Sequence, residues 1–224
     1  MARSAPSLRK PSEPAALPLK QARAMRTREN LLRAGTALLQ DGGFDQVSIA
    51  QIAKLAGCSV GTFYFSFRDK EAYFRFLLDS VFEEVQARSR EQLVPCRPEV
   101  PDPEAAVRRC VEHFIDIARR HEGLMRTVMQ HTAYNIEGWQ PTRALGMWLI
   151  DLYRACVVPH YPAAERPRVA RHLEISLQIF MGYINNAVLH KPEPLNLASP
   201  ALGEWMTATV MASLERRDLP DPAP

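Results

Sequence analysis

The chain has 224 residues, of which 46% are hydrophobic, with 28 lysines and arginines against 25 aspartates and glutamates. This length suits one sizeable core or a small domain carried on a larger one. The net charge of +3 gives no global basic field for nucleic acid, and no run of about 18 apolar residues predicts a membrane span. The cysteines, Cys58, Cys96, Cys110 and Cys156, show no paired metal or redox spacing, which favours a reducing cytoplasm.

The N-terminal segment concentrates positive charge. The first 33 residues contain eight lysines and arginines but only two glutamates. Residues 1–20 also contain four prolines, few large apolar side chains and no apolar core of a secretory signal, so we predict a disordered basic arm. Such an arm can contact nucleic-acid phosphates, whereas a solvated tail without a specific role explains the composition equally well.

The first helix is expected over residues 27–40. Its apolar positions from Leu31 to Leu39 share one face, and the sequence DGGF that follows is a stop signal. Helix N-termini and threonine hydroxyls bind phosphate well. The residues at the expected helix start that we predict to contact phosphate are Arg26, Thr27 and Arg28.

Residues 48–72 predict two short helices joined by a tight turn. In the first, apolar residues recur at i, i+3, i+4 and i+7, and Ser48 with the glutamine three residues later forms a capping-box pattern. Gly57 can adopt the positive φ that turns a chain sharply. A short turn containing glycine is typical of a helix-turn-helix.

The second short helix is expected to bury one face and present the other. Ser59 suits its N-cap, and the apolar face is formed by Val60, Phe63, Tyr64 and Phe67. The outward positions are Gly61, Thr62, Phe65 and Ser66. Small and polar residues let a helix approach base edges closely, so the pair predicts major-groove binding. A plain corner between two helices of an enzyme is the alternative.

The region from Thr27 to Phe74 resembles the DNA-binding head of the tetracycline-repressor (TetR) family of bacterial regulators. The resemblance rests on Gly42, Gly43, Phe44, Ser48, Ile49, Ile52, Ala53, Ala56, Gly57, Val60, Gly61, Thr62, Phe63, Tyr64, Phe67, Lys70 and Glu71. It implies that Tyr64 and Lys70 hold phosphates and that Ser59 and Thr62 face the bases. Ser66 departs from the histidine frequent in the family, and a rim aromatic is the alternative for Tyr64. The full predicted DNA-binding set is Arg26, Thr27, Arg28, Ser48, Ser59, Thr62, Tyr64 and Lys70.

Beyond the head, helical periodicity continues between proline-rich breaks without an alternating strand pattern, so we predict an all-α fold of about nine helices. The later helices are expected over 69–91, from 102, over 123–134, from 140 or 141, over 166–189 and from 199, where Pro200 suits the first turn. With the resemblance, the expected domains are the arm at 1–20, the head at 21–70, an effector-binding and dimerisation domain at 71–216 and a disordered tail at 217–224.

The resemblance implies a homodimer formed by the last two helices. Two heads roughly 34 Å apart would read a palindromic operator on double-stranded DNA, although an ordinary intrachain core explains those helices equally well. The helix over 69–91 is then the connector, and a ligand that moves it would release the DNA. Repression is the family's commonest behaviour, and activation stays open.

The middle helices are expected to enclose a pocket for a small apolar or aromatic effector. The expected lining residues are Phe114, Met125, Met129, His131, Tyr134, Trp148, Tyr153, Gln178, Phe180 and Tyr183, with Asn185 and Asn186 as further polar groups. Aromatic and methionine side chains also commonly fill cores, which is the alternative for each of them.

The sequence predicts no enzyme, metal or cofactor. It lacks a nucleophile elbow, a phosphate-binding glycine loop and a dinucleotide fingerprint, and its six histidines form no compact metal set. Oxidation of Cys58 in the turn would perturb DNA binding, although free cysteines usually act as small buried apolar residues. The main alternative function is an effector-independent or architectural DNA-binding protein that works through a protein partner. A pocket filled by the protein's own side chains would favour it.

Overall fold

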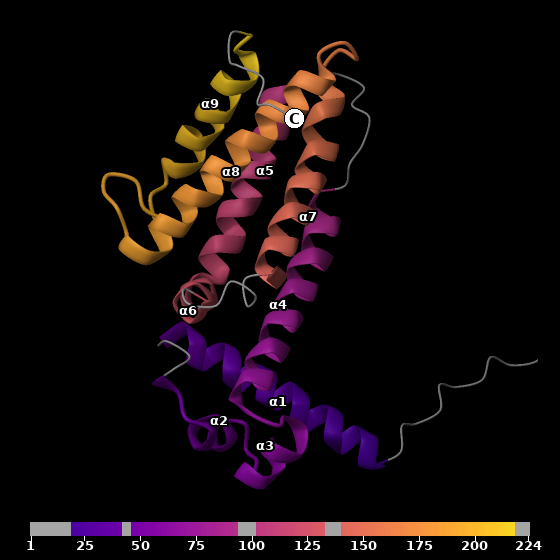
Figure 1. Ribbon diagram of the computed structural model, residues 1–224, viewed down its shortest axis with the longest axis vertical. Coiled ribbons are helices and arrows are strands. Elements are labelled where there is room, and N and C mark those ends of the chain that lie inside the picture. The colour runs from indigo at the N-terminus through magenta and orange to yellow at the C-terminus, as the bar shows by residue number, and fades with distance from the viewer. Residues whose placement is uncertain (1–18, 42–45, 94–101, 133–139, 218–224) are drawn as a thin grey trace, which may run out of the picture.

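The computed structural model describes residues 19–41, 46–93, 102–132 and 140–217, and every regular element within them is helical. The predicted all-α class is therefore confirmed. Figure 1 shows α1, α2 and α3 at one end, with α4 rising from them beside the remaining helices. The elements are α1 (Leu19–Asp41), α2 (Ile49–Leu55), α3 (Val60–Ser66), α4 (Lys70–Gln92), α5 (Pro103–Arg120), α6 (Glu122–Thr132), α7 (Gln140–Val157), the short 3-10 helix η3 (Val158–His160), α8 (Arg166–His190) and α9 (Leu202–Glu215).

Helix α1 begins earlier than the sequence pattern predicts. Its first residue is Leu19, so the part of the expected disordered arm at 19–20 is helical. The rest of that arm, residues 1–18, lies outside the described residues, as do Gly42, Gly43 and Phe44 and most of the expected tail. Leu19 directly follows the last proline of the arm, and no proline interrupts the 23 residues of α1.

Helix α9 begins later than expected, at Leu202 rather than Ser199. The Ser199 amide donates to the Asn196 carbonyl at 3.0 Å, and the Leu202 amide donates to the Ser199 carbonyl at 3.3 Å. These bonds form turns ahead of the helix, so the expected N-cap residue belongs to the preceding loop. Ala201, the actual N-cap, makes no side-chain capping bond.

The core of the head forms where α3 and α4 meet α1. Phe63 and Tyr73 are fully buried, and their ring centroids lie 5.2 Å apart in an edge-to-face arrangement. The Tyr73 hydroxyl donates to the Leu31 carbonyl at 2.7 Å, which ties α4 to α1. A Cβ atom added to Gly35 would lie 2.2 Å from that hydroxyl. The crossing of α1 and α4 therefore requires a glycine.

Helix α4 belongs to both parts of the molecule. The head core continues along α4 to Val85 and reaches Leu124 and Val128 of α6, which also packs against α1. A second core is formed mainly by α5, α7, α8 and α9. Ile117 and Leu145 pack against both cores. The bundle is thus connected to the head through α4 and through α6. None of the described helices is long and apolar enough to cross a bilayer.

Candidate nucleic-acid interface

The predicted capping box and glycine turn set the angle between α2 and α3. The Gln51 amide donates to Ser48 Oγ at 3.2 Å, while Gln51 Oε1 accepts from the Ser48 amide at 2.8 Å and from its hydroxyl at 2.7 Å. Gly57 has a φ of +66°, and its amide donates to the Lys54 carbonyl at 3.2 Å. The helix-turn-helix predicted from the sequence is present.

Helix α3 packs through a narrower stripe than the sequence pattern predicts. Phe63 and Phe67 are buried as expected. The expectation that Val60 and Tyr64 share the buried face is wrong, because 42% and 53% of their surfaces are exposed. Helix α3 has seven residues, and the two phenylalanines fill its contact with the core of the head. Val60 in the first turn and Tyr64 at the side of the apolar face therefore stay partly exposed.

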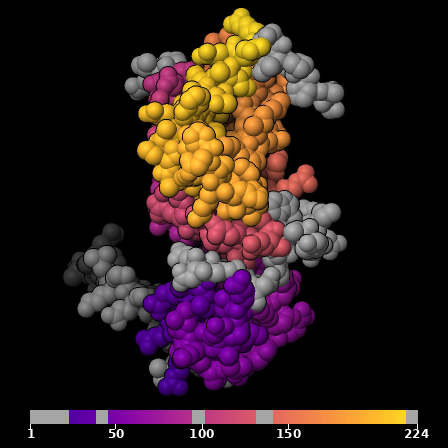
Figure 2. All heavy atoms as spheres, turned by 90° about the vertical axis from the view of Figure 1, so that its left-hand side faces the viewer, coloured from indigo at the N-terminus to yellow at the C-terminus, as the bar shows by residue number. Residues whose placement is uncertain are grey.

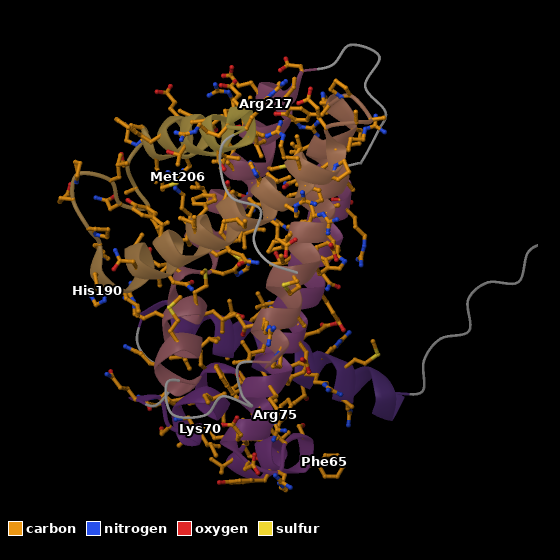
Figure 3. All side chains as sticks on the ribbon, turned by 45° about the horizontal axis from the view of Figure 1, so that its top comes forward. Phe65, Lys70, Arg75, His190, Met206 and Arg217 are labelled. Atoms are coloured by element: carbon orange, nitrogen blue, oxygen red, sulfur yellow. The ribbon has the colours of Figure 1, made fainter. Side chains whose placement is uncertain are left out.

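The outer face of α3 carries an aromatic residue that the predicted DNA-binding set omitted. Phe65 is 87% exposed and points from the head into solvent (Figure 3). Tyr64 beside it packs edge-on against Phe63, with ring centroids 5.7 Å apart, and keeps its outer half exposed. With the exposed Val60 and Tyr64, Phe65 gives the short helix α3 an apolar outer surface. Its outward position in the periodic pattern was the available signal.

Both predicted serines are engaged in helix caps. Ser59 Oγ accepts from the Thr62 amide at 3.1 Å and lies 2.9 Å from Thr62 Oγ1. Ser48 forms the capping box of α2. These bonds hold the N-terminal turn of each helix in place, so both serines position the reading surface whether or not they also contact DNA.

The predicted reason for phosphate contacts by Arg26, Thr27 and Arg28 is wrong. Because α1 begins at Leu19, these residues lie inside the helix, and the free amides of a helix N-terminus lie elsewhere. Arg26 is exposed, Thr27 is half-buried, and the Arg28 guanidinium lies 4.8 Å from the centroid of the Phe76 ring. Any phosphate contact here therefore depends on the side chains alone. Lys70 starts α4 directly after the Asp69 cap.

A cavity of about 230 Å³ lies between α4, α5, α6, α7 and α8. Three of the predicted lining residues, Phe114, Met125 and Met129, do line it, and so does Asn185. The side chain of His131 and all of Tyr134 lie outside the described parts of the structure. The structure places the remaining predicted residues elsewhere: Trp148, Tyr153, Gln178, Phe180, Tyr183 and Asn186.

The predicted lining residues that do not line the cavity have other surroundings. Trp148 lies under the Arg90 guanidinium, 5.0 Å from the ring centroid. Tyr153 is buried with its hydroxyl 2.9 Å from His113 Nδ1, and Phe180 packs against a lining residue from the core side. The Tyr183 hydroxyl donates to the Leu195 carbonyl, and Gln178 is exposed. The aromatic residues mostly build the core around the cavity, which was the alternative for each.

Several cavity residues were not predicted. Val81, Phe82 and Val85 contribute one wall from α4, the helix expected only to connect the two parts. On α7, the buried Oγ1 atom of Thr142 has no hydrogen-bond partner among the described residues. Burial lowers the pKa of the lining His121 imidazole, which keeps it uncharged at neutral pH. The cavity is thus mostly apolar, with a few polar groups on its walls.

The sequence of the head matches that of a known family. Residues 31–75 match the sequence model described as bacterial regulatory proteins, tetR family. The head of this chain is therefore similar to the DNA-binding head of the tetR family. The matched segment spans the second half of α1, then α2, the turn, α3 and the beginning of α4, and it includes the helix that carries the exposed outer face.

The relatives that this chain matches are transcription regulators by name. It is 29% identical over 137 residues to the repressor NicS of Pseudomonas putida, covering 60% of this chain and 63% of that protein. It is 32% identical over 96 residues to EthR of Mycolicibacterium smegmatis, covering 43% of each, and 35% identical over 104 residues to BetI of Yersinia pestis, covering 45% and 50%. The match thus spans less than two thirds of each relative.

The fold of the whole chain has solved counterparts. A putative TetR-family regulator from Mesorhizobium loti superposes with a TM-score of 0.67 at 19% identity, covering 86% of this chain and 96% of that one. A TetR regulator from Haloarcula marismortui gives 0.64 at 18% identity, covering 85% and 97%. At these identities the likeness shows the fold, and it includes the bundle behind the head.

Proposed function

We propose that this protein is a TetR-family, DNA-binding transcriptional regulator of the cytoplasm, most simply a repressor, that binds a two-fold symmetric operator as a homodimer and leaves it when a small ligand binds. The observation that carries the proposal is the outer face of α3. This face is held rigidly by the capped turn and presents Thr62, Tyr64 and Phe65. Selecting genomic fragments with the purified protein, with and without candidate ligands, tests it directly.

Two kinds of contact are assigned to the head. Tyr64 and Lys70 contact phosphates from the end of α3 and the start of α4, which sets the register on the duplex. Phe65 is assigned to the bases because it points away from the core (Figure 3), and Thr62 because it is partly exposed in the first turn of α3. A phenylalanine that enters the major groove makes apolar contact with the methyl group of thymine.

Replacing Lys70 with alanine is expected to weaken binding to every DNA sequence and to reduce the salt slope of log K by about 0.9, the loss of one phosphate contact. Tyr64→Phe removes only a hydroxyl and is expected to cost about 0.5–1.5 kcal/mol on all sequences. Fluorescence anisotropy over a range of salt concentrations measures both. Unchanged affinity and slope in both variants would remove the phosphate assignment.

Thr62→Ala and Phe65→Ala are expected to change the preference among operators instead. Loss of one base contact typically costs about 1–3 kcal/mol at the matching base pair and little elsewhere. Binding to a library of operators with single substitutions measures this. Equal losses on all members of the library would show that neither side chain reads bases.

The homodimer proposal is supported by exposed apolar side chains on α8 and α9. Figure 2 shows these helices side by side across the upper part of one face. Ile179 is 68% exposed and Trp205 is 62% exposed, and Ile175 and Leu189 add further apolar surface on α8. Apolar side chains gathered on one face mark an association surface. Pairing of this face with its copy in a second chain would give a dimer with a four-helix interface and two heads.

The ligand proposal is supported by the cavity, which is open rather than filled by the protein's own side chains. This favours a ligand-responsive regulator over an effector-independent one. Its volume of about 230 Å³ is below the range of drug-sized pockets, so we expect a small and mostly apolar effector. Thr142 Oγ1 and Asn185 would bind a single polar group on it. Because α4 contributes one wall, a bound ligand that displaces this wall would move the head.

Filling the cavity should abolish ligand binding without unfolding the protein. Gly146 lines the cavity, and a Cβ atom there would lie 3.5 Å from Met181 Sδ, an ordinary contact. Gly146→Leu is therefore expected to occupy the space, whereas Gly146→Ala leaves most of it open. Binding of toluene, measured by the thermal shift it causes, should be lost only in the leucine variant. An equal toluene shift in both variants would contradict the assignment of the cavity.

A further inference from the structure

Four chemically reactive side chains meet between α5 and α7, outside the surfaces assigned to DNA and ligand. Cys110 and His113 lie one turn apart on α5, and Tyr153 and Cys156 lie one turn apart on α7. His113 Nδ1 lies 2.9 Å from the Tyr153 hydroxyl, and the Cys110 thiol hydrogen-bonds with the Cys156 sulfur. The two helices therefore bring together a pair of free cysteines that lie far apart in the sequence.

The two sulfur atoms have different surroundings. Cys110 is 2% exposed in the bundle core. Cys156 is half-buried and lines a cavity of about 100 Å³ together with Arg109 and His160. The hydrogen bond with Cys110 and the nearby Arg109 charge lower the pKa of the Cys156 thiol, while that bond and burial raise the pKa of Cys110. Cys156 is thus the sulfur that faces the cavity, beside the Arg109 guanidinium, whereas Cys110 lies behind it in the core.

We propose that Cys156 is an oxidation site for small hydroperoxides and that Cys110 converts the oxidised product into a disulfide within the chain. The cavity is large enough for hydrogen peroxide, since a water molecule occupies about 30 Å³ in the liquid. The Arg109 guanidinium beside it favours the thiolate that attacks and the oxygen anion that leaves. The disulfide joins α5 to α7.

The chemistry balances with the hydroperoxide as the oxidant. The Cys156 thiol loses its proton, the thiolate attacks the terminal oxygen and the O–O bond breaks, which forms a sulfenic acid. The leaving alkoxide or hydroxide takes up the proton that the thiol lost and departs as an alcohol or water. The Cys110 sulfur then attacks the Cys156 sulfur, the S–S bond forms and the S–O bond breaks. The departing hydroxide takes the Cys110 proton and leaves as water. Two thiols are oxidised by two electrons, and one peroxide bond is reduced.

Oxidation of the pair would also change a contact at the C-terminal end of α4. The Cys156 thiol lies 3.9 Å from the carbonyl oxygen of Leu93, the C-cap residue of α4. A disulfide consumes the hydrogen of that thiol, so the carbonyl loses this weak donor. The pair therefore lies at the end of α4 opposite the head, where α5 and α7 pack beside it (Figure 1).

The test uses the full chain with Cys58→Ser and Cys96→Ser, which leaves only the proposed pair. Treatment with hydrogen peroxide under native conditions is expected to remove both thiols and to give a linked Cys110–Cys156 peptide by mass spectrometry, reversible by dithiothreitol. In the same background, Cys110→Ser should instead leave a sulfenic acid on Cys156 that dimedone traps. Cys156→Ser should leave Cys110 as a free thiol. Circular dichroism checks folding, with Cys110→Ala as the substitute if the serine variant unfolds.

Three results would overturn the proposal. The first is retention of both thiols at peroxide concentrations that oxidise Cys58 in the unaltered chain. The second is a disulfide between two chains, or between Cys156 and Cys96 in the unaltered chain. The third is dimedone labelling of Cys110 in the Cys156→Ser variant. These readouts do not depend on DNA binding, so they succeed or fail separately from the proposed regulatory function.

Discussion

Replacing Ile179 with glutamate is expected to lower operator affinity by about 10²-fold or more, although the substitution lies on α8, far from the head. The side chain is 68% exposed beside α9, so the monomer tolerates the charge. In the proposed dimer that surface is buried, and an unpaired carboxylate there is strongly unfavourable. A monomer binds with one head and loses the gain in effective concentration provided by the second.

Sedimentation equilibrium measures the oligomeric state, and band shifts on a full operator and on a half-site measure the affinity. Ile179→Val keeps the surface apolar and serves as the control, with dimer and affinity expected to be unchanged. The affinity for the half-site should be the same for the unaltered protein and for both variants, because the head is intact in each. A glutamate variant that stays dimeric would rule out this surface as the interface. A monomeric variant with full operator affinity would remove the role of the dimer.

Replacing Gly35 with alanine is expected to destabilise the protein by about 3 kcal/mol or more. The new Cβ would lie 2.2 Å from the Tyr73 hydroxyl and 2.7 Å from both Leu77 δ-carbons. The buried hydrogen bond from Tyr73 to the Leu31 carbonyl would break, and α1 would shift off α4. The helix-propensity gain of alanine over glycine, about 0.5–1 kcal/mol, does not offset this.

Urea unfolding measures the change, and Gly146→Ala on α7 is the matched control. There the added Cβ has room, so the same substitution in a helix is expected to stabilise by about 0.5–1 kcal/mol. Tyr73→Phe removes the hydroxyl with which the added Cβ clashes. The double variant should therefore lose less free energy of unfolding than the two single variants together. Additive losses would show that the hydroxyl is not the point of conflict.

The parts of the head that the sequence predicts are those set by local interactions. The capping box of α2, the positive φ of Gly57 and the Asp69 cap of α4 each depend on residues within one turn. The errors concern contacts between elements. Val60 has the periodicity of a buried residue, but its exposure depends on how far α3 overhangs its neighbours. The start of α1 was misplaced because no capping residue marks it.

The cavity and the thiol pair were less predictable for the same reason. Aromatic side chains suggested a pocket, but periodicity does not show which of them fill the core and which face the space. Tyr153 was therefore assigned to the wrong group. Cys110 and Cys156 have no motif spacing, and they meet only because α5 and α7 pack together. Such contacts depend on the relative placement of whole helices.

The packing of Ile117 and Leu145 against both cores has a consequence for how the molecule melts. These side chains join the core of the head to the core of the bundle, so unfolding of the head alone would expose them to water. The two parts should therefore melt in one cooperative transition, and a ligand held in the bundle should raise the melting temperature of α3 as much as that of α7. Thermal protection of the DNA-reading helix would thus report occupancy of a cavity that it does not touch.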